Sequence, residues 1–425
     1  MENSTAQKYR TIWNKVYVCA FSANFLLCIS LFMVNPLVAN YAKFLGADEV
    51  MIGLLSGLYF GVAFAARPFS GPAIAMLNKK RIMIFAYTLG VAVNTGYAIS
   101  GDIPVFMASR ILHGFQFAFV GSLNMTLASE SLPSGKMGSG LGLFSLSGAV
   151  ANAIAPSIGL ALRSWGEQTF GGLKQGYVVV YIAAATCMLI SIIPCVLLPY
   201  KKPSREAISK LGSWYKNIFA KEAMMPTIVI TLMSVSVISY TFYMERFAEA
   251  RGIGGIGLFF TVYAAALIAS RPISGWLIDK YGPTKVFIPS AFLFSLSFVV
   301  IGFSDSIGMI LVGAVVAAVG IGGSQPTIQT MCVLSVSPLR YGVASNTIYF
   351  GIDFGFFLGP VIAGIIINNY GFLSSFGVSD GRSITFSPLY LAMIAPVFLA
   401  IAVFISGLSA YKRNAVKARE AGGAE

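Results

Sequence analysis

Long apolar runs separated by short polar segments recur along the whole chain. Each run has about 20 residues or more, the length at which an α-helix crosses the roughly 30 Å hydrocarbon layer of a bilayer. The pattern therefore predicts membrane-spanning helices. Their expected ranges are 16–38, 51–76, 82–100, 104–129, 138–163, 176–199, 225–246, 255–278, 285–303, 307–333, 342–367 and 387–410.

The composition excludes a soluble globular protein. Hydrophobic residues make up 56% of the chain, charged residues make up 11%, and the mean hydropathy is +0.78, whereas soluble domains carry about 25% charged residues. The net charge of +13 is spread over short loops, so no nucleic-acid partner is expected. The five cysteines lie inside apolar runs and there is one histidine, which predicts neither a disulfide framework nor a metal site.

One hydrophilic segment, 200–224, interrupts the apolar runs near the middle of the chain. It divides the sequence into an N-terminal six-helix half, 1–199, and a C-terminal six-helix half, 225–425, with a basic tail. About twenty of the 29 Lys and Arg residues lie in the terminal segments, in 200–224 and in alternate loops, and such an excess marks the cytoplasmic side. We expect a multi-pass protein of the cytoplasmic (inner) cell membrane, with a cytoplasmic linker and both termini in the cytoplasm.

The two halves repeat each other. The segment Arg67-Pro68-Phe69-Ser70-Gly71 returns as Arg271-Pro272-Ile273-Ser274-Gly275, which is 204 positions later. Ala155-Pro156-Ser157-Ile158 and Gly359-Pro360-Val361-Ile362 match at the same offset. A parallel repeat of six spans predicts an all-α membrane protein of two pseudo-symmetric bundles that meet around a central cavity and rock to expose it to either side.

The residues of one loop resemble the signature of a known protein family. The stretch from Gly275 to Lys285, GWLIDKYGPTK, resembles the G-x-L-x-D-R-x-G-R-K signature of the major facilitator superfamily. The resemblance covers essentially the whole chain and implies the superfamily's twelve-helix fold and solute transport. It also implies a cytoplasmic latch in the outward-facing state, to which we assign Arg67, Arg271, Asp279, Lys280 and Lys285.

The first half departs from the signature, because Ala75 stands where the second half has Asp279 and only the basic cluster Lys79-Lys80-Arg81 is kept. A symmetric latch is therefore not expected. The alternative for Asp279 is a solvated turn residue paired with a neighbouring base.

Two further motifs refine the resemblance. Arg110-Ile111-Leu112-His113-Gly114 resembles the R-x-x-x-G motif of proton-coupled members, and Ala155-Pro156-Ser157-Ile158-Gly159 resembles the G-P-x-x-G motif of antiporters, with alanine in place of its first glycine. Together they imply a drug:proton-antiporter-like exporter. Pro156, Gly159, Gly359 and Pro360 are then helix-bend residues.

Asp353 is the one acid expected near the middle of a span. Such a charge costs about 2.5–3.5 kcal/mol on insertion scales, so an acid that is retained usually has a function. We hypothesise that Asp353 faces the cavity and takes up or releases the coupling proton or contacts a cationic group. The alternative is an acid permanently paired with a buried arginine, or hydrogen-bonded as a helix-packing element.

Three other ionisable residues are candidates for proton coupling or substrate contact. Arg110 is expected to modulate a nearby acid, although its side chain is long enough to snorkel to the membrane surface. His113, one turn later, either senses pH or contacts substrate, or it fills a packing position. Glu245, at the outer end of the seventh span, is either a proton site open to the exterior or part of a solvated salt-bridge cluster.

Uncharged polar residues inside the spans indicate a wet cavity, lined in the resembling superfamily by the first, fourth, seventh and tenth helices. Interhelical hydrogen bonds would use the same residue types, so both readings stay open. The candidates are Asn24, Asn35, Gln116, Tyr240, Tyr243, Gln325, Gln329, Asn346 and Tyr349.

No G-x-x-x-x-G-K-[ST] motif and no cluster of catalytic residues occurs in the sequence. We therefore expect a non-enzymatic secondary transporter that exports a small organic solute at the expense of a proton gradient and needs no cofactor. Uptake by a proton symporter or a uniporter is the alternative, and a membrane receptor or enzyme is a disfavoured third class. The expected partners are the small-molecule substrate and the lipid bilayer, and a monomer is expected.

Overall fold

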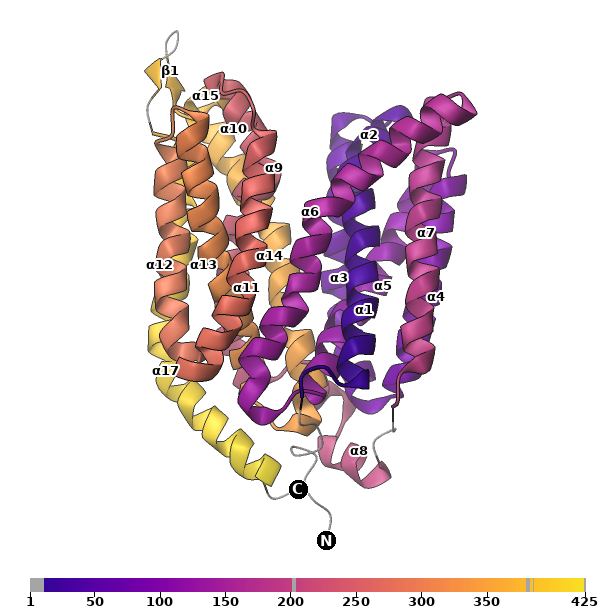
Figure 1. Cartoon of the computed structure of the whole chain (residues 1–425), viewed down its shortest axis with the longest axis vertical. Coiled ribbons are helices and arrows are strands. Elements are labelled where there is room, and N and C mark those ends of the chain that lie inside the picture. Colours follow the sequence, from indigo (N-terminus) through magenta and orange to yellow (C-terminus); the bar gives the residue numbers. More distant parts are fainter. Residues whose placement is uncertain (1–10, 201–203, 380–382, 385, 424–425) are drawn as a thin grey trace.

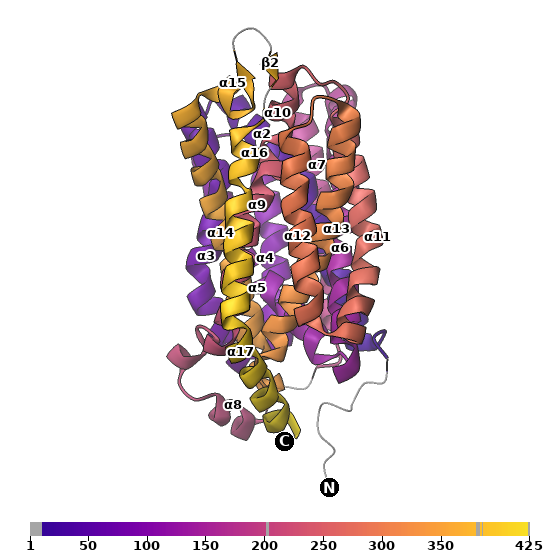
Figure 2. The ribbon, with the colours of Figure 1, turned by 90° about the vertical axis from the view of Figure 1, so that its left-hand side faces the viewer.

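In a computed structural model the chain forms two side-by-side bundles of helices (Figure 1). The structure describes residues 11–200, 204–379, 383–384 and 386–423. Within them, twelve helical segments are long and apolar enough to cross a membrane, as the sequence predicts. A view turned by 90° shows the helices running roughly parallel along the long axis (Figure 2).

The first bundle is built from helices whose starts are fixed by polar caps. Asn14, Asp48, Asn78 and Asp102 each accept the backbone N–H three residues later, which satisfies one of the free N–H groups of a helix start. The elements are α1 (Lys15–Val34), η2 (Asn35–Leu37), α2 (Val38–Phe44), α3 (Glu49–Met76), α4 (Lys79–Ile99), α5 (Ile103–Glu130), η3 (Ser134–Lys136), α6 (Met137–Phe170) and α7 (Leu173–Leu197).

A linker of short helices precedes the second bundle. The linker holds α8 (Arg205–Leu211), η4 (Trp214–Asn217) and η5 (Lys221–Ala223). The second bundle holds α9 (Met224–Phe242), α10 (Met244–Arg251), α11 (Gly257–Tyr281), α12 (Pro283–Gly302), α13 (Ile307–Leu334), η6 (Pro338–Arg340), α14 (Tyr341–Tyr370), α15 (Phe372–Ser375), β1 (Val378–Ser379), β2 (Ser383–Ile384), α16 (Pro388–Ala392) and α17 (Ile394–Gly423). The two strands form a small antiparallel hairpin, with Val378 opposite Ile384.

Some helices extend beyond the predicted ranges. The fifth span was expected to end at 163 and the last at 410, but α6 continues to Phe170 and α17 to Gly423. The apolar pattern ends where the membrane ends, whereas the helix continues as long as its backbone hydrogen bonds do.

The repeat of 204 residues is visible in the helix bounds. Helix α13 starts and ends 204 positions after α5, and the starts of α12 and α14 lie 204 positions after those of α4 and α6. Positions related by this offset therefore occupy corresponding places in the two bundles.

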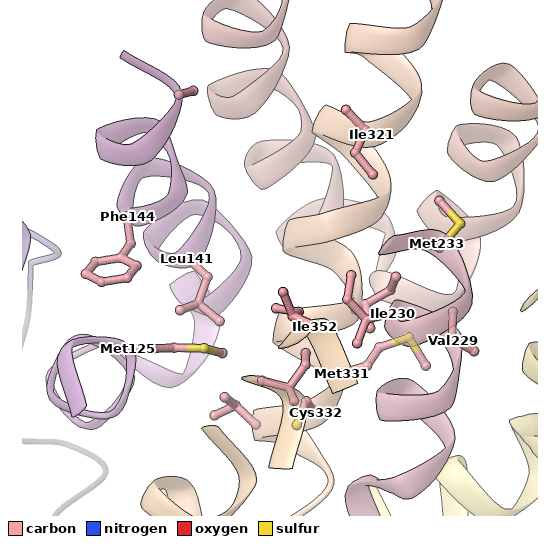
Figure 3. Packing of buried hydrophobic residues seen from close by; sticks show 14 of the residues in the cluster. Met125, Leu141, Phe144, Val229, Ile230, Met233, Ile321, Met331, Cys332 and Ile352 are labelled. Carbon is pink, nitrogen blue, oxygen red and sulfur yellow. The ribbon is translucent and has the colours of Figure 1, made fainter. Parts of the chain in front are cut away.

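The bundles are tightly joined at one end of the molecule. We call this end, where α1 begins and α17 ends, the terminal face, and the other end the opposite face (Figure 1). One cluster of buried apolar side chains contains residues of both bundles, and Met125, Leu141 and Phe144 of the first lie across from Met331, Cys332 and Ile352 of the second (Figure 3).

Glycines of α3 show how the packing changes along this helix. Near the terminal face, a Cβ on Gly71 would lie 2.5 Å from the Asn346 amide nitrogen of α14. Gly53, five turns earlier on the same side of α3, has no such neighbour within 4 Å. The bundles are thus in contact toward the terminal face and separate toward the opposite face.

Candidate functional site

A buried ion pair joins the two bundles where α3 meets α14. Arg67 Nε lies 2.9 Å from Asp353 Oδ2, and neither side chain is exposed. Arg67 Nη1 also donates to the Ala118 carbonyl oxygen at 2.7 Å and to Ser122 Oγ at 3.2 Å, both on α5 of its own bundle. Removing one member of such a pair leaves an uncompensated buried charge, which is strongly unfavourable.

Asn346 makes a second polar contact across the same interface. Its Nδ2 donates to the Arg67 carbonyl oxygen at 2.8 Å, and its Oδ1 accepts the Ser70 hydroxyl at 2.7 Å. A side chain at Gly71 would clash with this amide, so glycine is needed for the close approach. The amide and the ion pair lie two turns apart on α14 and face the same stretch of α3.

Aromatic rings cover the ion pair. The Tyr349 ring centroid lies 5.0 Å from the Arg67 guanidinium carbon, a cation–π arrangement that partly offsets the cost of burying the charge. Rings of α3 and α14 also stack on each other near the pair, with centroid distances of 4.4 Å for Phe64 and Phe350 and 5.1 Å for Phe60 and Phe356. The rings therefore surround the pair with apolar surface, while Asn346, Ser70 and Ser122 supply the neighbouring polar contacts.

The second interface, between α6 and α11, is closed by a different contact. Asp279 Oδ1 accepts the Gly138 N–H at 2.7 Å and Oδ2 accepts the Ser139 N–H at 2.9 Å. A carboxylate at a helix start is favoured by the free N–H groups and the helix dipole. Asp279 is half-buried. Of the residues assigned to the latch, it is the one that bonds across this interface.

The other latch candidates lie elsewhere. Arg67 was expected in the latch at the cytoplasmic side but pairs with Asp353. It lies too deep for the latch, because nine residues, or about 14 Å of helix, separate it from the end of α3 at Met76. Arg271 Nη2 bonds Gln325 of its own bundle at 2.7 Å. Lys280 Nζ lies 4.6 Å from the ring of Trp276 on its own helix. Lys285 is exposed near the start of α12, and among the described residues no hydrogen bond from its side chain is found. Lys201 and Lys202 of the linker lie outside the described residues.

Arg110 is fixed inside the first bundle and does not snorkel. Its side chain donates to the carbonyl oxygens of Leu55 at 3.0 Å and Ser56 at 3.1 Å on α3, and it is 2% exposed. His113 Nδ1 lies 3.1 Å from the Tyr97 hydroxyl. The structure therefore holds Arg110 against α3 carbonyls, whereas the base beside Asp353 is Arg67.

Several of the predicted cavity residues bond within one bundle. Asn24 donates to Ser147 Oγ at 2.8 Å, and Tyr240 lies 2.6 Å from Ser297 Oγ. These are interhelical hydrogen bonds, the alternative the sequence left open. Gln116 and Gln329 are buried, whereas Asn35 and Tyr243 are half-buried near the opposite face.

Glu245 is exposed at the start of α10, and among the described residues no ion pair to it is found. This placement suits a solvated residue as well as a proton site open to the exterior.

Two of the four helix-bend residues, both glycines, lie at close helix crossings. Pro156 lies inside α6 and Pro360 inside α14, and neither helix is interrupted. A Cβ on Gly159 would lie 2.7 Å from the Met33 carbonyl oxygen, and one on Gly359 would lie 2.5 Å from Ile238. Gly159 lets α1 approach α6 closely, and Gly359 lets α9 approach α14.

Sequence reasoning did not identify Arg67 as the partner of Asp353 or Asn346 as a bridge between bundles. Two features of the sequence could have indicated these contacts. Asp353 needs a compensating base, and Asn346 lies on the same side of α14 as Asp353. Neither signal selects among the arginines within spans.

One chain that folds into two six-helix membrane bundles, with buried charges where the bundles meet, has the architecture of a secondary active transporter. The chain belongs to the Major Facilitator Superfamily, whose family model matches residues 20–257 and 224–423. Among the described residues, no group of three or more His, Cys, Asp or Glu side chains is placed to hold a metal ion.

Relatives and solved structures agree with this assignment. The multidrug resistance protein MdtG of several Escherichia coli strains is 24% identical over 389 residues, which cover 87% of this chain and 92% of that protein. The proton:xylose symporter XylE shares the fold at a TM-score of 0.73 and 10% identity, over 92% of this chain and 95% of its own. The transporter FucP in its outward conformation shares the fold at a TM-score of 0.70 and 13% identity, over 94% of this chain and 99% of its own.

Proposed function

We propose that the protein exports a small organic molecule in exchange for protons, by alternating access between its two bundles. The single observation that carries the proposal is the Arg67–Asp353 pair, a buried charge pair located where the bundles must separate. The similarity to MdtG, which is described as a multidrug resistance protein, supports export of an organic solute.

The terminal face is proposed to be cytoplasmic. The excess of Lys and Arg on the terminal, linker and alternate loop segments supports this orientation. The bundles are joined at that face, so the conformation described above corresponds to the outward-facing state. Asp353, Asn346 and Asp279 then hold the cytoplasmic side closed.

Protonation of Asp353 is proposed to release this closure. As a carboxylate, Asp353 attracts the buried guanidinium; as a neutral acid it loses that attraction. Its Oδ1 has no hydrogen-bond partner among the described residues and is the oxygen at which a proton can be taken up. Arg67 keeps its bonds to α5, so the first bundle retains the arginine while α14 moves away.

This sequence of events suits exchange. A proton that arrives from outside unlocks the cytoplasmic side, and its release to the cytoplasm lets the pair form again once substrate is bound for export. The groups that face Asp353 are Arg67 of α3 and Tyr349 of its own helix, with the phenol of Tyr59 farther along α3. Arg67 is the charged one, and it determines whether the acid is held ionised.

The test is transport in proteoliposomes that carry a pH-sensitive dye and a pH gradient, screened against small organic cations and amphipathic drugs. Wild type is expected to dissipate the gradient only when substrate is added. Asp353→Asn is expected to lose this coupling yet retain exchange of labelled substrate, and Asp305→Asn, an exposed acid, serves as the matched control. Unchanged proton coupling in Asp353→Asn would refute the proposal.

A further inference from the structure

A hollow at the terminal face lies between the linker and the turn that precedes α14 (Figure 1). Its volume is about 350 Å³, near the lower end of the roughly 300–1,000 Å³ of pockets that hold small ligands. Lys210 and Lys216 line it from the linker and Arg340 lines it from η6, and none of the described residues around it is acidic. The contacts that close the two bundles do not involve these three bases.

The turn between α8 and η4 brings the two lysines to the same hollow. Gly212 in this turn has a φ of 72°, a left-handed conformation that favours glycine. The Asn217 amide donates to the carbonyl oxygens of Leu211 at 2.9 Å and Ser213 at 3.1 Å and so holds the turn. A Cβ on Gly212 would lie 3.7 Å from Lys216 Cδ, so this lysine folds back over the turn.

The positive charge of the hollow is only partly compensated. Lys210 Nζ lies 3.8 Å from Glu206 Oε1, an exposed pair within α8 that contributes little. Arg340 Nη1 bonds Glu222 Oε1 of the linker, and no ion pair of Lys216 is found in the described part of the chain. Three bases around one concave surface produce a positive potential that attracts an anion.

The internal repeat shows that the linker creates this hollow. The offset of 204 residues relates Arg340, at the end of η6, to Lys136, at the end of η3. Lys136 is exposed, whereas Arg340 is half-buried and bonded to the linker residue Glu222. The linker therefore converts a surface base of the repeat into one wall of a pocket.

We infer that this hollow binds the phosphate group of an anionic phospholipid on the side proposed to be cytoplasmic. The residues next to Lys216 support a lipid as the source of the phosphate. Trp214 and Tyr215 begin η4 and are 41% and 68% exposed, and such rings prefer the headgroup layer of a membrane. Basic pockets on the cytoplasmic side of membrane proteins bind anionic headgroups. A soluble phosphate would meet the same bases, so the experiment separates the two sources.

The linker that forms this site also contacts both bundles where they close. The Ala220 N–H donates to Thr347 Oγ1 of α14 at 2.9 Å. On the first bundle, a Cβ on Gly71 of α3 would lie 3.2 Å from the Ile218 carbonyl oxygen. Resting on the proposed alternating access, a lipid phosphate that joins the two lysines to Arg340 holds the linker in this place and favours the closed terminal face.

Binding is tested by native mass spectrometry of the full chain with phosphatidylglycerol, with phosphatidylcholine of the same acyl chains, or with inorganic phosphate. Wild type is expected to bind phosphatidylglycerol at least about tenfold more tightly than phosphatidylcholine. Lys210→Gln/Lys216→Gln is expected to lose most of this preference. Lys136→Gln/Lys412→Gln, which removes two exposed lysines outside the hollow, is expected to keep it.

Two results would overturn the inference. An unchanged preference in Lys210→Gln/Lys216→Gln would show that the hollow is not the site. Inorganic phosphate that binds wild type as tightly as phosphatidylglycerol, and is lost in the same variant, would overturn the lipid source and assign the hollow to a soluble anion.

The effect on closure is tested with spin labels at Leu77→Cys and Tyr281→Cys, in a background without the native cysteines and at a pH where both conformations are populated. Adding phosphatidylglycerol to phosphatidylcholine nanodiscs is expected to raise the ratio of closed to open molecules at least about threefold in wild type. No change is expected in Lys210→Gln/Lys216→Gln. An equal change in both proteins, or none in wild type, would overturn the effect on closure. Neither measurement uses a proton gradient, so failure here is distinct from failure of the Asp353 test.

Discussion

The two interfaces between the bundles occupy corresponding places in the repeat but place their acids at different depths. At the α6–α11 interface, Asp279 lies near the membrane surface, and Ala149 occupies the deep position. At the α3–α14 interface this is reversed: Ala75 is at the surface, and Asp353 is deep and fully buried. Each interface has one acid, and the acids differ in their access to solvent.

The partners of these acids differ as well. Asp279 binds backbone N–H groups, which carry no full charge and do not titrate. Asp353 binds the guanidinium of Arg67, whereas the equivalent Arg271 bonds a glutamine of its own bundle. At the position of Asn346, the other interface has Gly142, beside the Arg271 carbonyl oxygen. The α3–α14 interface is therefore the one whose closure depends on a buried charge.

The largest effect is expected from Arg67→Met. It leaves the Asp353 carboxylate buried without a partner, which costs about 3–5 kcal/mol when a buried pair is broken. The closed terminal face is expected to open in most molecules, measured by spin-label distances between Leu77→Cys and Tyr281→Cys, exposed positions at the ends of α3 and α11, in a background without the native cysteines. The double variant Arg67→Met/Asp353→Leu is expected to close again, and a double variant that stays open would contradict the account.

Asn346→Leu is expected to have a smaller effect in the same direction. It removes the bonds to the Arg67 carbonyl oxygen and to Ser70 while keeping the ion pair, at a cost of about 1–3 kcal/mol for the groups left unpaired. The same label pair is expected to show a larger open fraction that still depends on pH. Loss of the pH dependence would mean that Asn346, and not Asp353, carries the proton response.

Asp279→Asn is expected to weaken closure by about 1 kcal/mol, the usual value of a helix cap with its dipole interaction. The pH response of the terminal face is expected to remain, because Asp353, which is proposed to carry it, is unchanged. A change as large as that of Arg67→Met would show that the two interfaces do not differ as described.

The smallest expected effect comes from Ala75→Asp, which places an acid at the surface of the α3–α14 interface. The Ala75 backbone lies near Gly342 at the start of α14, so a carboxylate there is expected to stabilise closure by about 0.3–1 kcal/mol through the helix dipole. The open fraction is expected to fall slightly and substrate turnover to slow. An increase in the open fraction would argue against equivalence of positions 75 and 279.

Much of the fold follows from sequence because a bilayer leaves few choices. Apolar runs of sufficient length must become helices, and the match between Arg67–Gly71 and Arg271–Gly275 relates the halves. The choice of Asp353 as a candidate site residue also follows from the sequence, since an acid in the hydrocarbon region rarely lacks a role.

The partner of Asp353 could not be predicted from the sequence. Arg67, Arg110 and Arg271 all lie within spans, and only the packing of one bundle on the other decides which one meets the acid.

The central claim, that the charge of Asp353 holds the terminal face closed, is tested most directly by the distance between spin labels at positions 77 and 281 as a function of pH. The carboxylate form favours the pair, so wild type is expected to show the short distance at high pH and a growing long-distance population as pH falls. Asp353→Asn is expected to show, at every pH, the long-distance population that wild type reaches only at low pH. A wild-type distribution that does not change with pH, or an Asp353→Asn protein that stays closed, would contradict the account.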